Sequence, residues 1–114
     1  MDYKAEFKET VAEAKHLQDL VAEPYGAFGQ IHKATMRDGV LTRKAKELIA
    51  MCIGINMRCE GCVISHTRGA LRSGATLEEI AEAVGVSILM GGGPATVYGA
   101  KALEAAKQFS ENPS

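Results

Sequence analysis

Apolar residues recur every three or four positions along the whole chain, and no segment shows the period-two alternation of a β-strand. Prolines, glycines and capping residues divide this helical pattern into segments joined by short connectors. The predicted helices cover about residues 2–22, 24–37, 42–57, 59–72, 76–90 and 94–109, and residues 112–114 are predicted to be a frayed tail. We therefore expect an all-α fold, with about six helices in one compact domain that spans residues 1–114.

The predicted helices differ in how much of their own surface is apolar. The first is amphipathic, and its apolar side carries Val11, Leu17, Leu20 and Val21. The centre of the third, residues 48–53, is apolar nearly all round, which predicts a fully buried helix. Several helices are rich in Ala and Gly on more than one side, and small side chains allow helices to approach closely. Because such a composition often accompanies subunit packing, we expect a homo-oligomer.

Composition narrows the classes of function. A net charge of −1 gives no support for a nucleic-acid partner or a membrane-surface partner. The longest uncharged run, residues 83–100, is interrupted by three glycines and a proline, which argues against a transmembrane helix. The first residues lack the apolar stretch of a signal peptide, and the chain has three cysteines, an odd number. We therefore expect a cytoplasmic protein, in a reducing compartment where paired thiols are catalytic or metal-binding more often than structural.

The cysteines supply the densest chemistry in the chain. Cys59 and Cys62 form a Cys-x-x-Cys pair, and His66 follows four residues later, so the three side chains share one face of a helix. Cys59 at the helix start would gain from the positive end of the helix dipole as a thiolate. His66 is placed to exchange a proton with Cys62. This pattern predicts a dithiol that alternates between reduced and oxidised forms.

Two other interpretations of the cysteine pair stay open. The first is metal binding, because Cys59, Cys62 and His66 are acceptable zinc ligands, with Cys52, His32 or His16 as a fourth. No second distant cysteine pair exists, and three cysteines are too few for an ordinary iron–sulfur site. The second is a pair of buried, inert thiols. We expect neither a metal nor a cofactor, and the apolar helical stretch before Cys59 argues against a thioredoxin fold.

Glu47 is the next candidate for the site. It lies twelve residues before Cys59, on the helix with the most apolar centre. A carboxylate there could orient His66 and hold its proton, as the third group of a relay. It could equally form a surface ion pair with Arg43 or Lys44, one turn earlier on the same helix. Sequence alone leaves both readings open.

The spacing of these four residues resembles the signature of the alkyl hydroperoxidase D-like branch of the carboxymuconolactone decarboxylase family. That signature has a glutamate, eleven intervening residues, Cys-x-x-Cys, three residues and a histidine, as in Glu47 to His66. The flanking segments 41–49, 74–80 and 90–95 agree with it as well. The resemblance covers about residues 24–106, nearly the whole domain.

The resemblance implies an all-helical alkyl hydroperoxidase D-like fold and a role for each of the four residues. Cys62 would be the nucleophile and Cys59 the proton donor and resolving thiol, while Glu47 and His66 would form the proton relay. Short single-domain relatives commonly assemble as trimers of dimers. We accordingly expect a homo-oligomer that is a trimer or a homohexamer. True carboxymuconolactone decarboxylases lack the cysteine pair, so the family name would describe the fold.

The expected function is that of a thiol-dependent antioxidant oxidoreductase with peroxidase activity. It would reduce a hydroperoxide, or relay electrons to a peroxiredoxin-type partner, and an external thiol would restore the dithiol. Some peroxidase members carry a histidine directly before the second cysteine, where this chain has Gly61. Two alternatives remain at this point: a helical metal-binding or regulatory domain without turnover, and a carboxymuconolactone decarboxylase-like enzyme.

Overall fold

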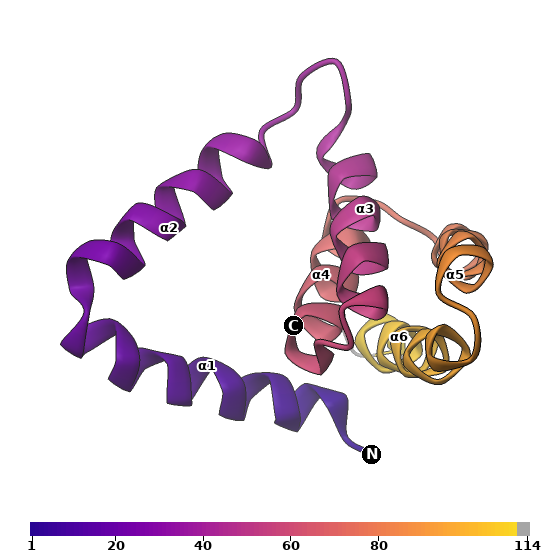
Figure 1. The fold of residues 1–114 in the computed structure, drawn as a ribbon, viewed down its shortest axis with the longest axis horizontal. Coiled ribbons are helices and arrows are strands. Elements are labelled where there is room, and N and C mark those ends of the chain that lie inside the picture. The colour runs from indigo at the N-terminus through magenta and orange to yellow at the C-terminus, as the bar shows by residue number, and fades with distance from the viewer. Residues whose placement is uncertain (112–114) are drawn as a thin grey trace.

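The computed structural model describes residues 1–111, which fold into six α-helices joined by short connections. The all-α prediction is confirmed, and the predicted frayed tail lies outside the described residues. Figure 1 shows α3 to α6 packed together, while α1 and α2 form a V-shaped arm that extends to one side. The helices are α1 (Tyr3–Leu20), α2 (Ala22–Thr35), α3 (Arg43–Asn56), α4 (Glu60–Arg72), α5 (Leu77–Gly91) and α6 (Gly93–Glu111).

The core lies between α3, α4, α5 and α6 and is almost entirely aliphatic. Met51 and Ile55 of α3 are fully buried, and they belong to the same cluster as Val63 of α4 and Ile80 of α5. The buried face of α6 consists mainly of alanines. Their small side chains allow α6 to lie close to the neighbouring helices. This bundle holds α3 and α4 side by side, and the candidate site residues lie on that helix pair.

The arm is attached to the bundle by the start of α1. Asp2 caps this helix by accepting the N–H of Ala5 at 3.0 Å, and the backbone N–H of Tyr3 donates to Gln108 Oε1 at 2.8 Å. The ring of Tyr3 is buried in a second small cluster with Phe109 of α6. Phe7 of α1 is partly buried against the same cluster, with its ring edge-to-face with that of Phe109 at 6.1 Å, whereas α2 has no buried residue at all.

Two expectations about burial are wrong for the single chain. The apolar side of α1 is uncovered, with its four predicted residues between 39% and 84% exposed. In α3, Ile49 and Ile53 are 47% and 54% exposed, although we predicted a fully buried helix. The physical reason is that α4, α5 and α6 cover only part of the α3 circumference, and no other helix within residues 1–111 covers the remaining side.

The uncharged run over residues 83–100 is divided between two helices. Gly92 lies between α5 and α6 with a φ of +70°, a left-handed conformation that glycine adopts without a steric penalty. None of the helices within residues 1–111 is long and apolar enough to cross a membrane.

Candidate active site

The tight turn between α3 and α4 places Cys59. Arg58 adopts a left-handed conformation with φ +58°, and its N–H donates to the carbonyl of Ile55 at 3.2 Å. The N–H of Cys59 donates to the carbonyl of Gly54 at 3.0 Å. These two bonds form a Schellman motif, which ends α3 and satisfies its last carbonyls. Cys59 is therefore fixed by its backbone at the end of α3 and, at the same time, is the N-cap of α4.

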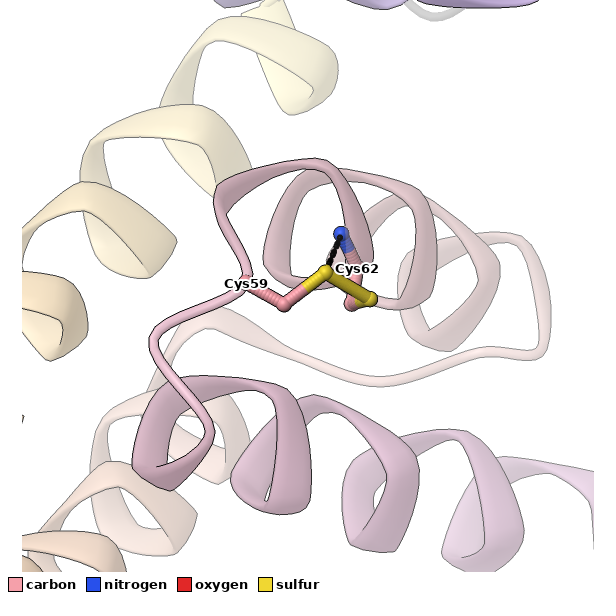
Figure 2. The surroundings of a disulfide bond; sticks show 2 residues. All are labelled: Cys59 and Cys62. Carbon is pink, nitrogen blue, oxygen red and sulfur yellow. Dashed lines mark hydrogen bonds between the residues drawn. A yellow bond between two sulfur atoms is a disulfide. The ribbon is translucent and has the colours of Figure 1, made fainter. Parts of the chain in front are cut away.

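Cys59 and Cys62 form a disulfide across the first turn of α4, with their Cα atoms 5.2 Å apart (Figure 2). The Sγ atom of Cys59 also accepts the backbone N–H of Cys62 at 3.2 Å, drawn as the dashed line in the figure. Cys62 is exposed, whereas Cys59 is half-buried. The two sulfur atoms thus differ in access, and Cys59 holds the cap position that stabilises negative charge at a helix N-terminus.

Glu47 and His66 form a pair on the same two helices. The carboxylate of Glu47 is 97% buried, and its Oε1 lies 2.7 Å from His66 Nδ1. Arg43 approaches the other oxygen, Oε2, at 3.8 Å. Glu47 thus makes the predicted contact with His66 and also pairs with Arg43 one turn earlier on α3, although this ion pair is buried at its Glu47 end and not on the surface. With Nδ1 held by Glu47, His66 keeps Nε2 for proton exchange elsewhere.

Two glycines make room for these side chains, and sequence reasoning missed both. A Cβ atom added to Gly69 of α4 would lie 2.6 Å from Cδ of Glu47, so only glycine lets the carboxylate lie against that helix. In the opposite direction, a Cβ at Gly54 of α3 would lie 3.1 Å from Cβ of Cys62. Each helix thus provides a notch for a side chain of the other. The only sign of these notches in the sequence is that each glycine stands inside a predicted helix, where no turn accounts for it.

Charged residues surround the first turn of α4. Lys101 of α6 lies 3.1 Å from the carboxylate of Glu60, and the carboxyl of Glu6 on α1 hydrogen-bonds that of Glu60. This carboxyl–carboxyl hydrogen bond raises the pKa of Glu6 and lowers the pKa of Glu60, which Lys101 further stabilises as an anion. Glu60 therefore supplies a fixed negative charge beside Cys59, and Lys101 balances it.

The remaining sequence candidates lie apart from the disulfide. His32, one of the possible fourth zinc ligands, has an exposed side chain, and its ring lies 6.0 Å from the ring of His66. Cys52 is a half-buried free thiol whose Sγ donates to the carbonyl of Ala83 at 3.3 Å, and His16 is exposed on α1. Within residues 1–111, no three His, Cys, Asp or Glu side chains are arranged to hold a metal ion.

The arrangement joins a dithiol–disulfide couple to a carboxylate–imidazole pair on a single helical hairpin. Such a couple can exchange electrons with thiols and peroxides. The imidazole, oriented by a buried carboxylate, can take up or return a proton in the same step.

Comparison with known proteins places the chain in a family. The model of the carboxymuconolactone decarboxylase family matches residues 22–105. An uncharacterized protein of Cupriavidus necator is 46% identical over 77 residues, which is 68% of each chain. Uncharacterized protein 4 in the cox locus of Paracoccus denitrificans is 39% identical over 77 residues, 68% of this chain and 69% of that protein.

Solved structures show the same fold. A carboxymuconolactone decarboxylase family protein from Legionella pneumophila, crystallised in its apo form, superposes with a TM-score of 0.90 at 34% identity. The alignment covers 95% of this chain and 96% of that one. A family protein from Thermotoga maritima, for which an involvement in the antioxidative response has been suggested, has a TM-score of 0.82 at 25% identity. That alignment covers 93% and 91% of the two chains.

Proposed function

This chain belongs to the carboxymuconolactone decarboxylase family, and within it we propose a thiol-dependent antioxidant oxidoreductase of the alkyl hydroperoxidase D-like kind. It reduces hydroperoxides, or relays electrons to a peroxiredoxin-type partner, by cycling Cys59 and Cys62 between dithiol and disulfide. The observation that carries the proposal is the disulfide at the start of α4, one turn before a histidine oriented by buried Glu47. The antioxidative role suggested for the Thermotoga maritima protein agrees with this assignment.

In the oxidative half-reaction, the Cys62 thiolate attacks the peroxide oxygen of ROOH. The S–O bond forms as the O–O bond breaks, and the alcohol leaves with a proton supplied by the Glu47–His66 pair. The Cys59 thiol then attacks the resulting sulfenic acid: the S–S bond forms as the S–O bond breaks, and the thiol proton leaves with the hydroxyl group as water. The exposure of Cys62 supports its role as the attacking sulfur, because a peroxide can reach it from solvent.

In the reductive half-reaction, an external thiolate attacks Cys62 and Cys59 leaves. Thiol–disulfide exchange is faster when the leaving thiol is the more acidic one. Cys59 fits this role, since its sulfur accepts the N–H of Cys62 and caps α4. The mixed disulfide on Cys62 is then resolved by a second thiol of the donor, which returns the chain to the dithiol state. A peroxiredoxin-type disulfide would receive electrons by the same steps in reverse.

We further propose that the working form is a homo-oligomer, a trimer or a trimer of dimers. A 14-residue helix with no buried residue, such as α2, is marginal in water on its own. Ile53 of the exposed side of α3 lines one shallow groove together with exposed Val86 and Met90 of α5. A further copy of the chain is the occupant that would cover these surfaces and the apolar side of α1.

The decisive experiment is a thiol titration before and after one equivalent of an alkyl hydroperoxide. Wild type should lose two thiols per chain while Cys52 stays free, and it should consume peroxide in the presence of a dithiol donor. Cys62→Ser should abolish consumption, whereas Cys52→Ser, which changes the thiol outside the pair, should retain it. Equal consumption by wild type and Cys62→Ser, or activity that survives complete thiol alkylation, would refute the proposal.

A further inference from the structure

The imidazole of His66 lies beside a second imidazole, that of His32, which the arm brings to the site. His32 belongs to the last turn of α2, and Figure 1 shows that this helix runs back towards the bundle before the connection to α3. The two ring centroids are 6.0 Å apart, and the ring planes are inclined by 26°. The arm, which has no other described part in the site, thus supplies a titratable side chain next to the proposed relay.

Both rings line one pocket of about 800 Å³, and neither cysteine lines it. The pocket gives water a route to His66 that does not pass the disulfide. Its volume is enough for several water molecules, each of which occupies about 30 Å³ in the liquid. At the observed separation of the rings, a water molecule can bridge a nitrogen of His32 and a nitrogen of His66.

Among residues 1–111, the two histidines are the only groups lining this pocket that readily change charge near neutral pH. The basic residues of the lining are arginines and a lysine, which ordinarily stay protonated there. Both carboxylates are engaged, since Asp38 accepts the backbone N–H of Arg43 and Glu47 Oε1 lies 2.7 Å from His66 Nδ1. The charged residues that line the pocket beside the histidines are Asp38, Arg43, Lys44, Glu47, Arg68 and Arg72.

The proposed reaction creates a need for such a second group. His66 gives up a proton as the alcohol leaves, and it must regain one before the next turnover. Because Glu47 holds Nδ1, the returning proton must reach Nε2. The side chain of His66 is only 22% exposed, whereas that of His32 is exposed and meets solvent directly.

We propose that His32 is a positioning residue that acts through His66, by carrying protons between solvent and Nε2 of His66. The imidazolium of His32 gives its proton to the bridging water as that water gives one of its own to His66. His32 then regains a proton from solvent or buffer, so only N–H and O–H bonds change and no electron is transferred. The use of this proton rests on the proposed function, but the exchange itself takes place in either redox form.

The test measures how fast His66 gains and loses a proton in full-length protein that carries ring-¹⁵N-labelled histidine. NMR relaxation dispersion of the His66 ring nitrogens, at the midpoint of its titration and in the disulfide form, gives this rate without any turnover. In weak buffer, His32→Gln should slow the exchange by about tenfold or more, since a positioned acid–base group contributes about 10²–10⁴-fold to a proton transfer. Added imidazole should restore the rate, because the pocket is large enough to admit it.

His16→Gln is the matched control, because it removes an exposed histidine from α1 and should exchange like wild type. His32→Gln should keep the fold, since α2 has no buried residue. Equal exchange rates in wild type and His32→Gln would overturn the proposal. So would an equal loss in His16→Gln, or a loss in His32→Gln that imidazole does not restore, because either would be a structural effect.

Peroxide consumption in weak buffer provides a second measurement. Under the proposed function, His32→Gln should consume peroxide more slowly than wild type, and imidazole should restore the rate. A wild-type chain that consumes no peroxide would contradict the proposed function alone, because the exchange rate of His66 in the disulfide form still decides the role of His32.

Discussion

Replacing Gly69 with alanine should displace the carboxylate that orients His66. The added Cβ would lie 2.6 Å from Cδ and 3.0 Å from Oε1 of Glu47, well inside ordinary van der Waals contact. Glu47 is buried and its Oε1 lies 2.7 Å from His66 Nδ1, so a rotation of the carboxylate away from Gly69 would cost this hydrogen bond. The variant must either break the Glu47–His66 hydrogen bond or move α4 away from α3.

Two opposing terms set the size of the effect. Alanine in a helix interior is favoured over glycine by about 0.5–1 kcal/mol. Overpacking a close contact costs about 1–3 kcal/mol. We therefore expect Gly69→Ala to lower the free energy of unfolding by roughly 0–2.5 kcal/mol, which is the range left when the first term is subtracted from the second. The rate of peroxide consumption should fall by a larger fraction than the free energy of unfolding, because the proposed Glu47–His66 proton relay loses its geometry.

Gly85→Ala is the matched control. Gly85 is also inside a helix, α5, but a Cβ there would meet nothing within 4 Å, so this variant should gain about 0.5–1 kcal/mol. Urea denaturation and peroxide consumption of both variants provide the comparison. In a Glu47→Ala background the clash is absent, and Gly69→Ala should then become stabilising, like the control. If Gly69→Ala matches Gly85→Ala in stability and keeps full activity in the wild-type background, the close approach of Gly69 to the Glu47 carboxylate affects neither the free energy of unfolding nor the reaction.

Two further predictions concern other parts of the fold. The pKa of Glu79 is lowered, first by the N–H of Thr76 in the capping box and next by Lys44, so its stabilising contribution is present above the unfolded pKa and lost as pH falls through the folded one. Glu79→Gln should therefore reduce stability to urea at neutral pH and lose that deficit at strongly acidic pH; an equal deficit at both would contradict the ionic origin. Ile53→Asp should shift the mass measured by light scattering towards the 12.1 kDa monomer if the exposed side of α3 is a subunit contact. A wild-type chain that is already monomeric at every concentration would disprove the oligomer.

Sequence predicted local features of the fold well, because their causes are local. Thr42 and Thr76 are among the capping residues that divide the helical pattern, and they cap α3 and α5; Pro24 lies in the first turn of α2. Burial was predicted less well, since it depends on which helices pack against each other. Ile53 lies in the apolar stretch 48–53, as a core residue would. Within residues 1–111, however, no helix covers it, and its side chain is 54% exposed.

For the site, sequence identified the chemistry but could not identify its surroundings. The Cys-x-x-Cys spacing identified the two cysteines that the structure joins as a disulfide, and Glu47 was named for contacts with His66 and Arg43 that the structure contains. The notch at Gly69 depends on the distance between two helices, and no pattern within α4 encodes that distance. Whether the four residues act as proposed is a matter for the thiol experiments.

The short α3–α4 turn also has a consequence for folding. Glu47 and His66 are only 19 positions apart, and the turn at Arg58 lies between them, so their contact closes a short loop with a small entropic cost. Contacts of low sequence separation form early and quickly in helical proteins. We expect the geometry around the sulfur atoms to be established by this hairpin before α1 and α2 find their final positions. The same locality makes residues 47–69 a natural unit for transplantation into a designed helical bundle, because this segment includes both glycine notches, Gly54 and Gly69.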